Sequence, residues 1–386
     1  MIYKIIKYLY NSFILYTNLN IQEPTLDYNK YKDILEYLPL SFNNNLDKSV
    51  LEKNELLLAI KSFCEKQNTS TFIISLSGGV DSMVLISIIR NLGYRTVGVH
   101  INYNNREETK KEQEFLEEWC KNNSIVLYTH SIPDIKRQNS KRSTYELETK
   151  NIRFNFYHQV LQSESYINNF NVDYKNMILI GHHKDDIVEN IFANVCRGRY
   201  ILDLAVIKET NEINNITIAR PMIEFYKKSI YEFAIDNNVP YFKDTTPEWS
   251  IRGKYRNNIY PLLEDAFSNN IKNNLLGLSN QSYEWNKLIM IDIIEPFLNE
   301  IEVWSNYCKF NVQKHVDKPL CFWNLIFMKI FYKYNLNCPS RKGIQTFIDH
   351  INRIGYVSIS KNCKCYIKNY DVEIKFNLDN EINYIE

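Results

Sequence analysis

A strand that runs into a glycine-containing turn and then into a helix is the feature that most constrains the fold of this chain. The turn reads Ser77-Gly78-Gly79-Val80-Asp81-Ser82, with the mainly apolar segment 73–76 before it and the apolar run 83–85 after it. The chain has only 10 glycines in 386 residues, so two adjacent glycines mark a place where the backbone itself comes close to another group or a ligand. Strand, tight turn and helix in this order predict an α/β sheet with a binding site at the end of the strand.

The chemistry of this turn predicts that the site takes an anion. Gly78 and Gly79 let the backbone approach a ligand closely. Ser77 and Ser82 supply hydroxyl groups, and the helix start offers free N–H groups and the positive end of the helix dipole. This set of groups suits pyrophosphate. No lysine follows the glycines as it does in the G-x-x-x-x-G-K-[ST] loop, which disfavours transfer of a γ-phosphoryl group.

Asp81, in the same turn, is a candidate magnesium ligand. A carboxylate does not attract phosphate by itself, but Mg²⁺ is commonly held by one or two carboxylates together with substrate phosphates. The alternative is that the two glycines form a plain tight turn and that Asp81 and Ser82 only cap the helix. The complete motif after an apolar strand favours the anion site.

Helix-like and strand-like segments alternate along the chain from residue 51 to about residue 240. Such alternation predicts an α/β fold in which a parallel, doubly wound sheet has helices on both faces. The expected strands are 71–76, 96–101, 125–130, 177–180 and 216–219, and the expected helices are 51–66, 82–91, 107–122, 144–163, 185–197 and 227–237.

The chain divides into three expected parts. Residues 1–50 are rich in Tyr, Asn and Leu without a sustained period and are expected to form an N-terminal extension. Residues 51–270 form the α/β domain, and residues 271–386 form a smaller, mainly helical (α+β) C-terminal domain. Its expected helices are 273–297, 323–334 and 341–354, and its expected strands are 356–360 and 372–376. Asn-rich patches such as 211–215 are expected to be loops.

A second group of polar residues follows the expected strand 177–180. It reads Gly181-His182-His183-Lys184-Asp185-Asp186-Ile187-Val188-Glu189. Asp186 and Glu189 are three residues apart and share one helix face, where they could hold a magnesium ion or a cationic amine. His183 could act near neutral pH as acid, base or hydrogen-bond donor. The alternative is a capped helix whose first-turn acids only favour its dipole.

The two motifs resemble those of the PP-loop ATP pyrophosphatases, and their order is similar to that in the tRNA(Ile)-lysidine synthases. The resemblance covers residues 70–265, while Tyr103, Phe154 and Asn190 depart from the usual family residues. The related tRNA 2-thiolation enzymes are the alternative; they carry C-x-x-C pairs, which this chain lacks. Further matching segments are His100-Ile101-Asn102, Glu146, Arg153-Phe154, Arg197-Gly198, Arg220-Pro221, Asp244 and Tyr255-Arg256-Asn257.

The resemblance implies a PP-loop nucleotide-binding domain and a two-step base modification that uses ATP and Mg²⁺. In the first step, the C2 oxygen of cytidine 34 in the CAU anticodon of tRNA(Ile) is adenylated; in the second, L-lysine displaces AMP. The implied ligands of ATP are Ser77, Gly78, Gly79, Val80, Asp81, Ser82 and His100, with Asp81 also holding the metal. Asp186 and Glu189 would hold the amine of lysine. Arg153 and His183 would stabilise the phosphate charge that develops during transfer.

Basic and aromatic residues that follow the second motif are candidates for gripping the tRNA. Arg197, Arg252 and Arg256 are the expected RNA contacts, because guanidinium groups bind the phosphate backbone. Trp249 and Tyr255 lie between them in sequence and could stack on bases. The alternative is that these are scattered, solvated surface charges.

Charge, cysteines and hydropathy narrow the remaining possibilities. Lys+Arg 46 against Asp+Glu 45 gives a net charge of +1, so no global basic field points to nucleic acid. The eight cysteines are scattered, which favours a reducing compartment and hence the cytoplasm, with targeting to an organelle left open. No run of about 18 apolar residues occurs, so no membrane partner is expected. The oligomeric state stays open, a homodimer included.

Overall fold

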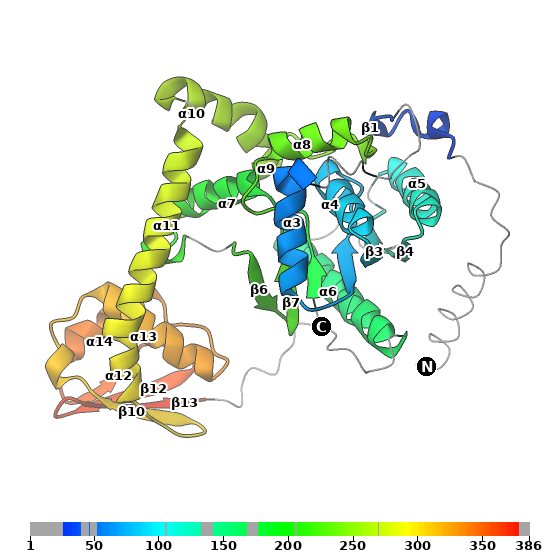
Figure 1. Ribbon diagram of the computed structural model, residues 1–386. Helices are drawn as coiled ribbons and strands as arrows, with labels where there is room; N and C mark the ends of the chain where they lie inside the picture. Colours follow the sequence, from blue (N-terminus) through cyan, green and yellow to red (C-terminus); the bar gives the residue numbers. More distant parts are fainter. Residues whose placement is uncertain are drawn as a thin grey trace. The chain divides into compact units, whose positions relative to one another are not determined.

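The computed structural model describes residues 26–39, 46, 52–104, 106–132, 142–167, 177–204, 207–268 and 270–377. These residues form two compact units, each described here by itself (Figure 1). The first unit runs up to residue 198 and resumes from 206 to 276, and the second holds 199–205 and the residues from 277 onward. The boundary falls inside helix α11 (Ile271–Ile289), a few residues beyond residue 270.

A six-stranded sheet forms the centre of the described part of the first unit. Its strands are β2 (Thr71–Ser75), β3 (Arg95–Asn102), β4 (Val126–Ser131), β5 (Met177–Leu179), β6 (Thr210–Ile213) and β7 (Ile216–Ala219). The order across the sheet is β4, β3, β2, β5, β7, β6. All neighbours are parallel except β6, which pairs antiparallel with β7 at one edge. The α/β prediction is therefore confirmed, with one antiparallel edge strand added.

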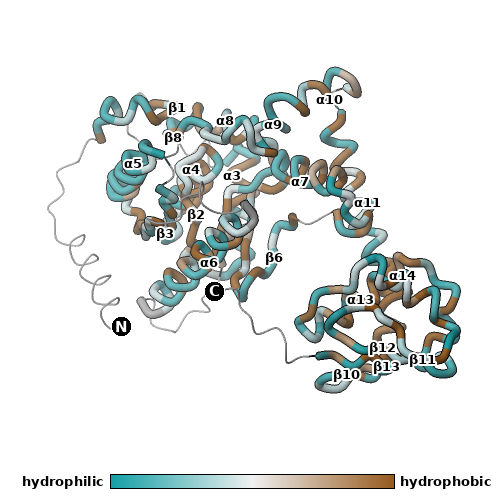
Figure 2. Tube along the Cα trace, turned by 180° about the vertical axis from the view of Figure 1, so that it is seen from behind, coloured by the Kyte–Doolittle hydropathy of each residue, from teal (hydrophilic) through white to brown (hydrophobic). Residues whose placement is uncertain are grey.

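Helices cover both faces of this sheet (Figure 1). On β2, Phe72 and Ile74 point to one face, and Ile73 points to the other, as the two-residue period of a strand requires. Helix α5 is largely hydrophilic (teal in Figure 2) and buries Phe115 and Trp119 on its inner side. The helices on the Phe72 face are α3 (Glu55–Lys66), α4 (Val80–Asn91), α5 (Glu108–Asn122) and α8 (Lys227–Asp236), and the opposite face carries α6 (Arg142–Ile167).

Residues 26–39 belong to the core of the first unit. Strand β1 (Leu35–Tyr37) pairs antiparallel with β8 (Tyr241–Phe242). Tyr31, in the short helix η1 (Tyr28–Tyr31), is fully buried with its ring 5.1 Å from that of Phe115. Part of the expected N-terminal extension thus helps to build the α/β unit, and the rest of 1–50, apart from residue 46, lies outside the described residues.

The Asn-rich patch 211–215 departs from the expected loop. Residues 211–213 belong to β6, and only Asn214 and Asn215 form the connection to β7. Both have positive φ angles, 51° and 59°, as a two-residue hairpin turn requires. Asparagine tolerates this conformation better than most residues with a side chain. The patch is therefore an edge strand followed by a tight turn.

Four further helical segments complete the first unit around the sheet. They are α7 (Lys184–Cys196), α9 (Ile251–Lys254), the π-helical turn η3 (Tyr255–Ile259) and α10 (Tyr260–Phe267). Helix α7 follows β5 and carries the second motif in its first turn, so both motifs start at the carboxyl ends of neighbouring strands. Across the described residues, no helix combines the length and the apolar character needed to cross a bilayer.

The second unit is an α+β domain, as expected for the C-terminal region. Its antiparallel sheet has the order β11 (Gly355–Val357), β12 (Cys363–Lys368), β13 (Asp371–Phe376), β10 (Tyr307–Asn311), β9 (Glu302–Val303). Helices α13 (Leu320–Lys333) and α14 (Arg341–His350) pack on it around Trp323 and Phe347. The sequence analysis missed β10 and β12, although Cys363, Cys365 and Ile367 alternate with lysines or half-buried residues as a half-buried strand does.

Candidate functional site

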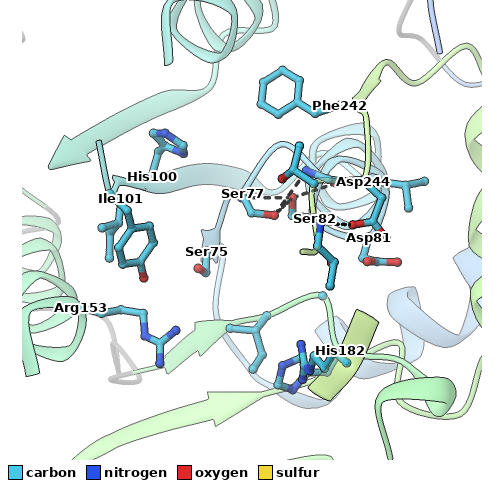
Figure 3. A pocket seen from close by; sticks show the side chains of 18 of the residues that line it. Ser75, Ser77, Asp81, Ser82, His100, Ile101, Arg153, His182, Phe242 and Asp244 are labelled. Carbon is cyan, nitrogen blue, oxygen red and sulfur yellow. Dashed lines mark hydrogen bonds between the residues drawn. The ribbon is translucent and has the colours of Figure 1, made fainter. Parts of the chain in front are cut away.

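A cavity of about 1440 Å³ opens at the carboxyl ends of β2, β3 and β5 in the first unit. The loop Ser77–Ser82 bounds it on one side, and Arg153 and His182 reach into it from the other (Figure 3). This is where a doubly wound sheet places its ligands. Ten of the predicted site residues line it: Ser77, Gly79, Val80, Asp81, Ser82, His100, Arg153, Asp186, Arg252 and Arg256. Gly78, His183, Glu189 and Arg197 are not among the lining residues.

Hydroxyl groups hold the loop between β2 and α4 in shape. The Ser82 hydroxyl accepts hydrogen bonds from the backbone N–H groups of Ser77 and Gly78, both at 3.2 Å, and donates one to the Gly79 carbonyl at 3.0 Å. Ser82 is itself buried, whereas Ser77 is exposed to the cavity. Ser82 is therefore an internal brace of the loop as well as a lining residue, and Ser77 is the freer hydroxyl for a ligand.

The two adjacent positions 78 and 79 are glycines for different structural reasons. Gly78 has a φ of +82°, and a Cβ there would lie 2.0 Å from the ring of Phe242. Gly79 has an ordinary φ of −69°, and its nearest neighbour would be the Ser77 hydroxyl at 3.6 Å. Only Gly78 is required by conformation and packing. Gly79 faces the cavity, where a side chain would take ligand space.

A third glycine brings the two motifs together. A Cβ on Gly181 would lie 2.9 Å from the carbonyl carbon of Asp81 and 3.1 Å from the backbone nitrogen of Ser82. The turn after β5 therefore packs directly against the first turn of α4. A residue with a side chain at Gly181 would push the second motif away from the first.

Asp81 sits where the motifs meet, between two potentially cationic side chains. Its carboxylate oxygens lie 3.5 Å from Lys227 Nζ and 3.6 Å from His183 Nε2. Burial raises the pKa of Asp81 above its usual range, and the charge of Lys227 opposes this shift. Among the described residues, its Oδ1 has no hydrogen-bond partner. The sequence analysis missed Lys227, since a lysine at the start of a helix carries no motif signal.

Of the two histidines of the second motif, His182 lines the cavity and the predicted His183 does not. His183 is 1% exposed and lies behind the cavity wall, with its ring nitrogens 3.4–3.7 Å from the carboxylates of Asp81, Asp185 and Asp186. His182 lines the cavity instead. Its Nδ1 accepts a hydrogen bond from Arg220 at 3.2 Å, so its Nε2 carries the proton. Burial lowers the pKa of His182 to about 4, which keeps the ring neutral.

His100 and Arg153 both lie where the sequence predicted an ATP site. His100 Nδ1 is 2.9 Å from the Leu76 carbonyl, to which it donates, leaving Nε2 as an acceptor. Burial lowers the pKa of His100, so this ring is also neutral. Arg153 reaches the cavity from α6, one turn before Tyr157, whose hydroxyl donates to Ser75 at 2.8 Å. The permanently charged guanidinium group of Arg153 therefore lies across the cavity from the loop 77–82 (Figure 3).

The acidic pair and two of the expected RNA-binding arginines form one cluster. Arg256 Nη2 lies 3.6 Å and Arg252 Nη2 lies 3.8 Å from Asp186 Oδ1. Arg252 Nε lies 3.5 Å from Glu189 Oε2, and Arg256 Nε donates to Glu189 Oε1. Burial acts to raise the pKa of Asp186, but His183 and Arg252 beside it, together with a hydrogen bond from the His183 backbone N–H, outweigh it and lower that pKa. From the sequence, the acids were expected to hold lysine and the arginines to contact RNA, so this pairing was not predicted.

Arg197 does not belong to this cluster. It is exposed and caps the far end of α7, whose 13 residues begin beside Asp186. At about 1.5 Å per residue, helix length separates the two ends by roughly 20 Å. The expected basic face is therefore split, with Arg252 and Arg256 at the cavity and Arg197 away from it.

The fold and the two motifs agree with those of a known protein family. Residues 53–263, more than half of the chain, match the PP-loop domain family. The chain belongs to this family. The match confirms the predicted PP-loop fold, and together with the relatives named below it confirms the prediction that the chain is an ATP-using ligase.

Relatives that match most of the chain share one name. A protein of Chlamydia felis named tRNA(Ile)-lysidine synthase is 26% identical over 309 residues, which is 79% of this chain and 92% of that protein. One of Francisella tularensis subsp. novicida with the same name is 29% identical over 241 residues, 62% of this chain and 56% of that protein. Among solved structures, the U34-tRNA thiolase NcsA from Methanococcus maripaludis aligns with a TM-score of 0.45 at 15% identity, covering 60% of this chain and 78% of that one.

Proposed function

We propose that this protein converts cytidine 34 in the CAU anticodon of tRNA(Ile) to lysidine, with ATP and L-lysine as co-substrates. The observation that carries the proposal is that the PP-loop and Asp186 line the same cavity, so that an activated base and an amine could meet there. The shared name of the relatives that match most of the chain supports the same chemistry.

In the first step the base becomes adenylated. The loop 77–82 would hold the pyrophosphate part of ATP through backbone N–H groups and the Ser77 hydroxyl, at the positive end of α4. The C2 oxygen of the cytidine attacks the α-phosphorus, and pyrophosphate leaves. Arg153 and His182 line the cavity, and their N–H groups would stabilise charge on the phosphoryl oxygens.

Asp81 suits the Mg²⁺ that such chemistry uses. Its buried Oδ1, which has no hydrogen-bond partner among the described residues, gives one hard oxygen donor next to the anion loop. No three or more His, Cys, Asp or Glu side chains among the described residues are arranged to hold a metal ion by themselves. Magnesium sites completed by substrate phosphates and water need only one or two carboxylates. The ion, when bound, would neutralise phosphate charge beside the loop.

In the second step lysine replaces AMP. Asp186 and Glu189 would hold the side-chain ammonium of lysine, as two carboxylates on one helix face can. The ammonium gives up a proton, its lone pair attacks C2 of the adenylated base, and the C2–O bond breaks to release AMP. The carboxylates that hold the amine are the nearest groups able to take that proton.

The alternative of 2-thiolation finds no support in the cavity. None of the residues that line it is a cysteine. The buried cysteines of the second unit lie in its core, and burial raises the pKa of Cys308 to about 12, so it is not a ready nucleophile.

The test is the co-substrate dependence of AMP formation. Full-length protein, ATP and a tRNA(Ile) transcript with a CAU anticodon should release AMP when L-lysine is added and not when glutamine or a sulfur donor replaces it. Asp81→Ala should abolish pyrophosphate exchange, whereas Lys228→Ala, at an exposed ion pair on α8, should keep it. AMP formation that needs sulfur rather than lysine would overturn the proposal.

A further inference from the structure

The proposed lysine site is already filled by side chains of the protein itself. Asp186 and Glu189 are 5% and 7% exposed, and the guanidinium groups of Arg252 and Arg256 lie within 3.8 Å of Asp186 Oδ1 and pair with both oxygens of Glu189. Arg256 lines the cavity while Glu189 does not, so the arginine stands between this carboxylate and the ligand space.

The two arginines are held in this position by the backbone that carries them. Ser250 caps α9 by accepting from the Gly253 N–H at 2.9 Å. A Cβ on Gly253 would lie 2.3 Å from the Pro247 carbonyl oxygen, so α9 packs closely on the preceding loop. Tyr255, between the two arginines in sequence, is buried with its ring 5.0 Å from that of Phe192 on α7. The ion pairs are therefore a built feature of the fold.

The oxygens of Asp186 and Glu189 that an ammonium would use already face guanidinium groups. A third carboxylate, that of the half-exposed Asp244, lies 3.5 Å from Arg256 Nη1 on the outer side of the pair. Removing the arginines without a replacement would leave two buried carboxylates uncompensated, which is costly. Glu189 Oε2 has no hydrogen-bond partner among the described residues even with both arginines present. An arriving ammonium and at least one arginine therefore compete for the same oxygens.

RNA is the partner whose chemistry would draw the arginines away. Guanidinium groups bind phosphate oxygens through paired hydrogen bonds. The side chain of Arg252 is 54% exposed and that of Arg256 is 25% exposed, so both are more accessible than the acids, whose side chains are 6% and 7% exposed. A phosphate of the anticodon strand near α9 would offer each arginine a new counter-ion.

We propose that Arg252 and Arg256 occupy the amine site until the RNA backbone takes them over, so that lysine binds tightly only after the tRNA. This inference rests on the proposed function, because it takes lysine as the amine and tRNA as the polyanion. The two arginines are positioning residues that set the order of binding. Linkage requires the reverse effect as well, so saturating lysine tightens tRNA binding by the same factor.

The experiment measures binding of radiolabelled L-lysine to the full-length protein by equilibrium dialysis. For the wild type, a tRNA(Ile) transcript should lower the lysine Kd by about tenfold or more, the scale of one lost charged contact. The double variant Arg252→Ala/Arg256→Ala should reach that tighter Kd without tRNA. Adding Glu189→Gln to the double variant should weaken lysine binding again, and the control Lys228→Ala should behave like the wild type.

The outcomes separate this inference from the proposed function. Equal lysine affinity in the wild type with and without tRNA would overturn the order of binding, while lysine-dependent AMP formation would keep the proposed function. No lysine binding under any condition would overturn both. The comparison of wild type with and without tRNA stays decisive even if the double variant fails to fold.

Discussion

Alanine should destabilise the protein much more at Gly78 than at the adjacent Gly79 of the PP-loop. At Gly78 the φ of +82° costs a residue with a Cβ about 1–2 kcal/mol. The Cβ would also lie 2.0 Å from the Phe242 ring, and relieving such overlap in a packed region costs about 1–3 kcal/mol more. Gly78→Ala should therefore destabilise the first unit by about 2–5 kcal/mol. Gly79→Ala meets neither obstacle and should change stability by less than about 1 kcal/mol.

Hydrogen exchange with mass spectrometry on peptides from residues 71–91 is the assay, because these peptides report on the first unit alone. A double-mutant cycle with Phe242→Ala separates the two causes, since that change removes the overlap and leaves the φ cost. The cost of Gly78→Ala should fall by about 1–3 kcal/mol in the Phe242→Ala background. Equal losses of stability at Gly78 and Gly79, or no energetic coupling between Gly78→Ala and Phe242→Ala, would rule out the two causes proposed for Gly78.

Three further outcomes follow from the site. Gly181→Ala should raise the KM for ATP in pyrophosphate exchange, because its Cβ would press on the Asp81 backbone 2.9 Å away; an unchanged KM would contradict the close packing of the motifs. Lys227→Met should weaken ATP binding about tenfold or more by removing a cation beside Asp81, as isothermal titration can show. As the pH falls from about 6.5 to about 4, stability should drop because His182 takes a proton in the unfolded chain but not in the folded one. Urea unfolding of His182→Gln should show a flatter profile in that window, and a profile identical to the wild type would count against a neutral His182.

Much of the α/β unit could be predicted because its elements carry local signals. Apolar strands, helical segments and turn residues placed β7 at 216–219 and α8 from residue 227, where the structure has them. In the second unit β12 was missed although its six residues alternate between buried and less buried positions as those of β13 do. The role of residues 26–39 depends on pairing between β1 and β8, about 200 residues apart, which no local pattern encodes.

The residues of the site could be predicted from the sequence better than the contacts between them. The motifs named the loop, Asp81 and the acids of α7, because each follows a strand end. Adjacent side chains leave the backbone in different directions. Which of His182 and His183 faces the cavity therefore depends on how the backbone runs at this one turn. The pairing of Arg252 and Arg256 with Asp186 and Glu189 joins segments more than 60 residues apart in sequence, so only the fold reveals it.

Mass spectrometry of the nucleoside at position 34 is the decisive test of lysidine formation, after incubation with tRNA(Ile), ATP and L-lysine labelled with ¹⁵N only at its side-chain nitrogen. We expect a cytidine that has gained one lysine with loss of one water and carries the heavy nitrogen on the base fragment. An unmodified cytidine, or a sulfur atom at C2, would contradict this expectation.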